Sequence, residues 1–247
     1  ASALAPPPVP HMHGDIGDAW LTRLIDGERA HLQRLSGAAR ITRLQQIQAS
    51  IQSHLAKVGS IAPLLSWISV LGDWSGNLQG AAAIAKLDEA DALFERIRQL
   101  APRDSAGLHF AHAYYLRLRS ERERSRTAQD AALLQAEQLL ARIGTDELPL
   151  ALVQLESAEI HLARARLGDG AASHSHYTQA AELGIAAARS PENEARALTC
   201  ALTALVALQA THADPARIAA LRTLSRRLLE LTPSSAVGVR LSGQGNL

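Results

Sequence analysis

The chain has 247 residues and a formal net charge of +1 at neutral pH. Alanine and leucine together occupy 86 positions, against 8 aromatic residues, 13 isoleucines and 7 valines. Alanine and leucine are strong helix formers, whereas β-branched and aromatic residues favour strands, so the composition predicts an all-α fold. The balanced charge gives no general electrostatic reason to bind nucleic acid or an anionic membrane surface, and we expect neither as a partner.

Residues 1–14 are predicted to form an extended leader, because they contain the proline-rich run Ala5–Pro10. A start of this kind remains after removal of a signal peptide or after trimming of the chain, and proline-rich segments form solvated spacers. We therefore expect an exported, periplasmic bacterial protein, with the cytoplasm as the alternative. No run of 18 apolar residues occurs, so no transmembrane segment is expected.

Apolar residues recur at intervals of three and four, which indicates roughly ten helices in all. The first is expected over 15–35 and the second, which has the clearest apolar stripe, over 39–58. A third begins near Pro63 and a fourth covers 78–100. Residues 15–76 are predicted to form a divergent hairpin that caps the rest of the chain.

From residue 77 to 236 the pattern predicts repeated helical hairpins. Turn signals fall at Pro102, near residue 145, at Pro191 and at Pro233, so the steps are about 43, 46 and 42 residues. Each step holds two helices, which would bury their apolar faces by stacking on neighbouring hairpins. The tail, 237–247, is expected to pack along the last hairpin or to hang free.

Some of these residues resemble the tetratricopeptide repeat family. Ala90, Phe94, Ile97 and Pro102 resemble the second helix and closing proline of one repeat, Leu108, Ala111 and Tyr115 the first helix of the next, and Leu228–Pro233 the same helix ending. The resemblance implies a right-handed array of stacked antiparallel hairpins. Two departures are that His112 and Glu156 stand where the family usually has glycine, and that the units exceed its period of 34 residues.

The resemblance also implies the function, a non-catalytic scaffold or adaptor that binds a protein or peptide on the concave surface of the array. Such a scaffold would suit a bacterial envelope or transport complex. The first helix of each hairpin lines that surface, and ordinary packing or exposure is the alternative for each residue. The groove positions of the family fall on His109, Ala113, Leu116 and Arg117 in one helix, and on Val153, Ser157 and His161 in another.

The segment Arg117–Arg126 carries five arginines and two glutamates and directly follows Tyr114 and Tyr115. One interpretation is a helix end that extends into a solvated loop. The other is a contact patch in which arginines hold a carboxylate or phosphate and tyrosine supplies rigid contact area.

A small-molecule or metal-binding protein with an enclosed pocket is the second function that the sequence permits. His109 and His112 are one helical turn apart, and a pocket would bring both together with a carboxylate. No third ligand stands at a familiar spacing, so we expect no metal or other cofactor. Phosphate-loop and nucleophile motifs are lacking, so we do not expect an enzyme, and Cys200 is predicted to be a buried structural thiol.

Overall fold

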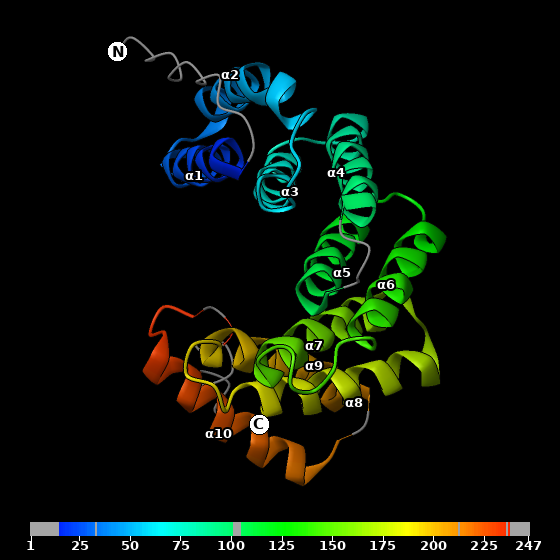
Figure 1. Cartoon of the computed structure of the whole chain (residues 1–247). Helices are drawn as coiled ribbons and strands as arrows, with labels where there is room; N and C mark the ends of the chain where they lie inside the picture. Colours follow the sequence, from blue (N-terminus) through cyan, green and yellow to red (C-terminus); the bar gives the residue numbers. More distant parts are fainter. Residues whose placement is uncertain (1–14, 33, 101–104, 212, 236, 238–247) are drawn as a thin grey trace. The chain divides into compact units, whose positions relative to one another are not determined.

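The computed structural model describes residues 15–32, 34–100, 105–211, 213–235 and 237. The leader at 1–14, the turn residue Pro102 and the tail from 238 onward therefore lie outside the described residues. Within the described ranges the regular elements are ten α-helices, which confirms the predicted all-α class (Figure 1). They are α1 (Asp15–Leu32), α2 (Gly37–Leu55), α3 (Ala62–Ser75), α4 (Ala81–Leu100), α5 (Ala106–Ser120), α6 (Arg126–Leu140), α7 (Leu150–Leu167), α8 (Gly170–Ala187), α9 (Glu194–Thr211) and α10 (Pro215–Leu231).

The chain divides into two compact units, residues 1–105 and residues 106–247. The expected boundary between residues 76 and 77 falls in the loop between α3 and α4, and these two helices pack against each other within the first unit. Pro63 occupies the first turn of α3, where the sequence placed it. Helix α4 begins at Ala81 because Gly80, with φ of +59°, adopts the left-handed conformation that glycine tolerates best.

In the first unit, α1 packs against α2 and α3, and α3 packs against α4. The Arg96 guanidinium on α4 donates to the backbone carbonyls of Leu55 and Val58 and so satisfies acceptors at the end of α2. Large side chains fill the core of this unit, among them Ile25, Leu44, Ile51, Trp67, Trp74 and Phe94.

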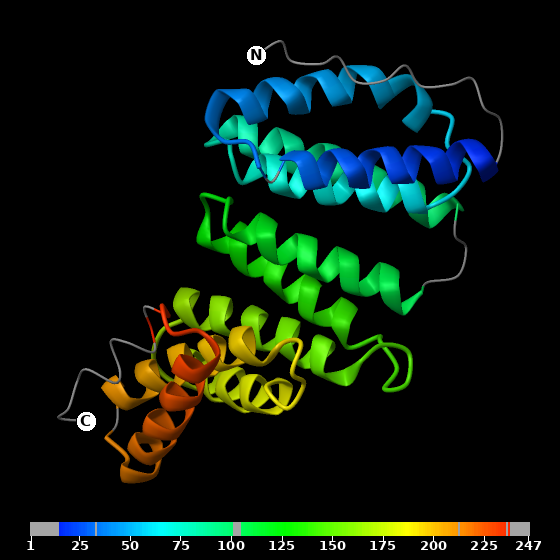
Figure 2. The same cartoon turned by 90° about the vertical axis from the view of Figure 1, so that its left-hand side faces the viewer.

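The second unit contains three consecutive hairpins, α5 with α6, α7 with α8, and α9 with α10 (Figure 2). Their first helices begin at residues 106, 150 and 194, thus 44 residues apart each time. Helix α7 contacts α5 and α6 of the preceding hairpin and α9 of the following one. That these hairpins are tetratricopeptide repeats, and that the array is right-handed, stay predictions.

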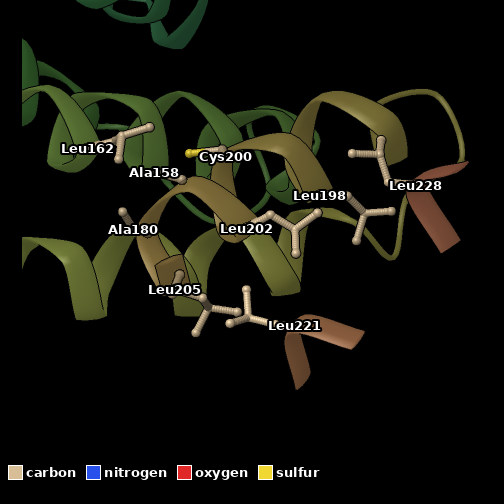
Figure 3. Close-up of a cluster of buried hydrophobic side chains, with 11 residues drawn as sticks. Ala158, Leu162, Ala180, Leu198, Cys200, Leu202, Leu205, Leu221 and Leu228 are labelled. Carbon is tan, nitrogen blue, oxygen red and sulfur yellow. The ribbon is translucent and has the colours of Figure 1, made fainter. Parts of the chain in front are cut away.

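Small residues let the helices of the second unit approach closely. A Cβ atom at Gly184 on α8 would lie 3.0 Å from the Ala201 Cβ and 3.1 Å from the Ala197 carbonyl oxygen on α9. Figure 3 shows the core near this contact, in which leucines of α9 and α10 form a cluster and Cys200 lies near Ala158 and Leu162. The close approach therefore rests on a glycine in the second helix of a hairpin, whereas the family resemblance drew attention to His112 and Glu156 in first helices.

Candidate functional site

The residues that the resemblance assigned to a binding surface lie on α5 and α7. On α5, four of these side chains are buried, those of His109, Ala113, Leu116 and Arg117. On α7, Val153 and Ser157 are half-buried and His161 is buried. The buried side chains present little surface to a partner in this conformation. Their role as contact residues stays a prediction, and their neighbours within the chain are described first.

Arg117 is the centre of a buried ion-pair network. Its Nε donates to Glu156 Oε1 at 2.6 Å, and its Nη2 lies 2.9 Å from Glu159 Oε2. A third carboxylate, Glu121, accepts from Nη1 at 3.4 Å. The Glu156 side chain is only 2 % exposed, so this pair joins α5 to α7 away from water. Arg117 therefore already has carboxylate partners within its own chain.

Arg196 extends the network to α9, the first helix of the third hairpin. Its Nε and Nη2 donate to the two carboxylate oxygens of Glu159 at 2.6 and 2.5 Å, in the fork geometry that suits arginine and carboxylate. Burial raises the pKa of the Glu156 carboxyl, against the opposing effect of the Arg117 guanidinium. Burial alone would lower the pKa of Arg117, but its carboxylate neighbours hold that pKa above its usual value. Charged groups thus tie α5, α7 and α9 together.

A hollow of about 680 Å³ lies beside this network, and we refer to it below as the hollow. Its lining comes from α5, α6, α7, α9 and the residue after α5, all within the second unit. Apolar side chains form part of the lining, among them Leu118, Leu133, Leu162 and Leu167. Charged side chains form another part, namely Arg117, Glu121, Glu159, Arg166 and Arg196. A lining of this mixed character can hold an apolar body and orient a polar group.

Cys200 also lines the hollow, and its side chain is buried, as the sequence predicted. Burial raises the pKa of its thiol to about 12, and the charges of Glu159, Arg166, Arg117 and Arg196 all act on it. The thiol is therefore protonated at neutral pH and is a poor nucleophile. Its electrostatic neighbours indicate that the charged groups converge on this part of the hollow.

Arg166, near the end of α7, differs from the other two arginines of the hollow. Its side chain is exposed, and among the residues that the structure describes it has no hydrogen-bonded or ion-paired acidic partner. Sequence reasoning did not single out Arg166 or the hollow-lining face of α9. A signal for that face was present, because Arg196, Thr199 and Thr203 recur at i, i+3 and i+7 on a helix otherwise rich in alanine and leucine.

The buried histidines of the second unit lie on α5 and α7. His161 on α7 and His176 on α8 face each other with 3.1 Å between their Nδ1 atoms, and their rings stack. His112 stacks instead on Tyr115 of its own helix. In the described parts of the chain, no three histidine, cysteine or acidic side chains are grouped as metal ligands would be. Both His109 and His112 are buried on α5.

The arginine-rich segment begins in the last turn of α5, crosses the loop at 121–125 and ends at the start of α6. Arg117 is buried, while Arg119 pairs with Glu123 at 3.0 Å. The segment therefore follows the first interpretation, a helix end that continues into a loop, and contributes Arg117 and Glu121 to the hollow.

None of the described helices combines the length and apolar character needed to cross a membrane. Comparisons with protein-family models, with curated proteins and with solved structures found no match to this chain. The fold and the candidate site therefore rest on the residues and geometry given above.

Proposed function

We propose that this chain is a non-catalytic binding protein, a scaffold or adaptor, and that a peptide segment of its protein partner occupies the hollow. The observation that carries the proposal is the hollow itself, which is lined by successive first helices of stacked hairpins. Surfaces of this kind extend over several hairpins and suit elongated partners. The lining combines leucines with arginines and glutamates, so it offers both apolar contact and oriented polar groups.

Tyr114 supports this proposal because it is an exposed aromatic side chain in the lining of the hollow. The centroid of its ring lies 5.1 Å from the guanidinium carbon of Arg117, so the ring lies beside a cation. Tyrosine offers a large contact area at little cost in conformational entropy, and it is enriched in binding interfaces. A partner segment in the hollow would therefore pass Tyr114.

Photo-crosslinking tests the proposal directly. A benzophenone amino acid at Tyr114 should crosslink a partner in an extract of the source cells, and mass spectrometry should locate the crosslink on a peptide segment. The same benzophenone amino acid at position 134 provides the control, because Leu134 is exposed on α6 but does not line the hollow. Filling the hollow with Ala163→Phe should abolish the crosslink at Tyr114. Crosslinks that persist after filling, or that form equally at position 134, would contradict the proposal.

Substitutions at the buried network are unsuitable for this test. Arg117→Glu would place a third carboxylate beside Glu156 and Glu159 in a buried position, and the resulting loss of structure would itself weaken binding. Ala163 and Thr203 line the hollow and are half-buried, so changes there address the hollow without removing a buried charge.

The second candidate function is binding of a small molecule, which the size of the hollow favours. Its volume of about 680 Å³ falls within the range of roughly 300–1,000 Å³ typical of small-molecule sites. Native mass spectrometry of gently purified protein tests this candidate. A stoichiometric compound of low mass that Ala163→Phe displaces would favour the small molecule over the peptide.

We also propose that the protein is exported to the periplasm, on the proline-rich composition of residues 5–10. Fractionation of the source cells tests this point independently of binding. Recovery with cytoplasmic markers would contradict it.

A further inference from the structure

We infer that the segment bound in the hollow carries a single carboxylate beside apolar side chains, and that Arg166 is the residue that pairs with it. The inference rests on the proposed function, because it names the chemistry of the ligand in the same hollow. It depends on three observations: which arginine lacks a partner, how much charge lines the hollow, and which polar atoms the threonines leave available.

The three arginines of the hollow are not equivalent. Arg117 and Arg196 both pair with Glu159, and Arg117 pairs with the buried Glu156 as well. A ligand carboxylate that approached either of them would have to compete with a carboxylate already in place. Arg166 is exposed and has no such partner among the described residues. A ligand carboxylate can therefore pair with the Arg166 guanidinium without breaking an ion pair within the protein.

The charge of the lining limits the ligand to a single negative charge at this position. Three arginines and two glutamates, Glu121 and Glu159, line the hollow, so positive charge exceeds negative charge by one. Glu156, behind Arg117, reduces that excess further. A phosphate group carries close to two negative charges at neutral pH and would meet repulsion from these carboxylates. A carboxylate matches the single unpaired cation.

Two threonines of α9 favour a peptide over a free organic acid. Thr199 Oγ1 donates to the Ala195 carbonyl and Thr203 Oγ1 donates to the Thr199 carbonyl, both at 2.8 Å. Each hydroxyl proton is thus used within the helix, and the oxygen retains capacity to accept a hydrogen bond. Both residues line the hollow. A peptide supplies N–H donors for such acceptors, whereas a simple carboxylate supplies none.

The residues near Arg166 specify what flanks the carboxylate. Leu167 follows it in sequence, and Leu162 lies one turn earlier on the same helix, and both line the hollow. Apolar side chains on either side of the ligand carboxylate would bury area against these leucines. We therefore expect a segment of the form apolar–acidic–apolar.

A peptide pool tests the inference on the full chain. The probe is a peptide pool, X-Leu-Glu-Leu-X-NH2, with an uncharged BODIPY dye on its N-terminus and a mixture of uncharged residues at X. Matched pools carry Gln or phosphoserine in place of Glu, and acetate and succinate serve as competitors. Fluorescence polarisation should show the Glu pool binding roughly tenfold or more tightly than the Gln pool, as expected for a charge-assisted hydrogen bond. The phosphoserine pool should bind more weakly than the Glu pool.

Variants assign the effect to Arg166. Arg166→Gln should reduce affinity for the Glu pool to the level of the Gln pool and leave the Gln pool unchanged. Arg222→Gln is the matched control, because it also removes one positive charge from an exposed helical position but lies on α10 outside the hollow. Arg222→Gln should change neither affinity. Equal effects of the two substitutions would overturn the inference.

The outcomes separate this inference from the proposed function. Glu and Gln pools that bind equally, with both lost in Ala163→Phe and in Thr203→Phe, would overturn the role of the carboxylate and keep the hollow as a peptide site. Tighter binding of the phosphoserine pool, or binding of succinate with no binding of any pool, would overturn the inference as well. Failure of every pool and competitor to bind would count against the inference and the proposed function together.

Discussion

The two units of the chain have cores of different character. Of the 19 buried apolar residues among those described in the first unit, 2 are alanine, and the core also contains Trp67, Trp74 and Phe94. Of the 28 in the second unit, 12 are alanine, and the unit also buries Arg117, Glu156 and three histidines. Ser75 is the sole buried polar residue in the described part of the first unit.

The difference between the two cores bears on the stability of the first unit and on the binding proposed for the second. Large interlocking side chains stabilise a unit through the apolar area that they bury. Alanine-rich helices bring backbones closer together, and a buried charge requires partners that an apolar core would not need. The second unit has less large apolar packing and places a charged network beside a hollow, an arrangement that fits the proposed binding function.

The chain contains separate probes for the two units. All three tryptophans, Trp20, Trp67 and Trp74, lie in the first unit, and the single cysteine, Cys200, lies in the second. Tryptophan fluorescence therefore follows unfolding of the first unit, while reactivity of the Cys200 thiol follows opening of the second.

The largest effect is expected for Phe94→Ala in the first unit. Phe94 is 1 % exposed, and its truncation leaves a cavity in a tightly packed core. We expect unfolding monitored by tryptophan fluorescence to lose about 3–5 kcal/mol of stability. Gln99→Ala, at an exposed position on α4 of the same unit, is the control and should change stability by less than about 0.5 kcal/mol. A small effect of Phe94→Ala would mean that the first unit is not stabilised by its large side chains.

Glu156→Ala should produce a comparable loss in the second unit by another mechanism. It leaves Arg117 buried with fewer carboxylates, and the expected cost is about 3 kcal/mol. Opening of the second unit, followed by reactivity of Cys200 in denaturant, measures this loss. Glu182→Ala removes an exposed glutamate from α8 and should have little effect.

Replacing both members of that pair sharpens the contrast. The double variant Arg117→Met, Glu156→Leu removes the two buried charges together and should recover most of the stability lost in Glu156→Ala. A double variant that is as unstable as the single one would contradict the view that the uncompensated charge is the cause.

Gly184→Ala tests the close helix approach in the second unit. The added Cβ would meet Ala201 and the Ala197 carbonyl at 3.0–3.1 Å, so α8 and α9 must move apart. We expect a loss of about 1–3 kcal/mol by the thiol-reactivity measurement. Gly107→Ala on α5 is the control in the same unit, because nothing lies within 4 Å of its added Cβ. A gain of stability in Gly184→Ala would show that α8 and α9 are not in close contact at this position.

The smallest effect is a pH dependence of the second unit. Burial lowers the pKa of both His161 and His176, so the folded state binds fewer protons than the unfolded state near pH 6. Their contribution to stability is therefore present above the unfolded pKa of about 6.5 and is lost as the pH falls through the folded values. Glu137 and Arg164 also act on the pair, with opposite signs.

His176→Gln should flatten the loss of stability between pH 7 and pH 5, because glutamine cannot take up the proton. Gln138→Ala removes an exposed side chain without a titratable group from α6 and should leave the pH dependence unchanged. Melting curves at several pH values provide the measurement, and an identical slope in wild type and His176→Gln would contradict this account.

The helices could be predicted because their signals are local. Apolar periodicity and Pro63 placed α1 to α4 within a few residues of their observed bounds. The observed helix ends differ from the expected ones because apolar residues at helical spacing can continue into a turn that follows the helix. The second helix was expected to extend to residue 58, but α2 ends at Leu55 and a turn follows. Capping geometry rather than periodicity decides such ends.

The site could be predicted only in part, because its pairings are not local. Arg117 stood out through its charged neighbours in sequence, but its principal partner, Glu156, is 39 residues away. That pairing buries Arg117 within an ion-pair network, while its expected role as a contact residue stays a prediction. Arg166 has no distinguishing neighbours in sequence, and only the packing of α5, α6, α7 and α9 places it in the hollow.

Methyl NMR of the whole chain tests the central claim, that the second unit binds through the hollow, most directly. The methyl groups of Thr199, Thr203 and Ala163 line the hollow, whereas those of Ala83 and Ala90 lie in the core of the first unit. Titration with the Glu pool should shift the first three signals and leave the last two unchanged, and Arg166→Gln should require roughly tenfold more peptide for the same shifts. Shifts confined to methyl groups outside the hollow would contradict the account.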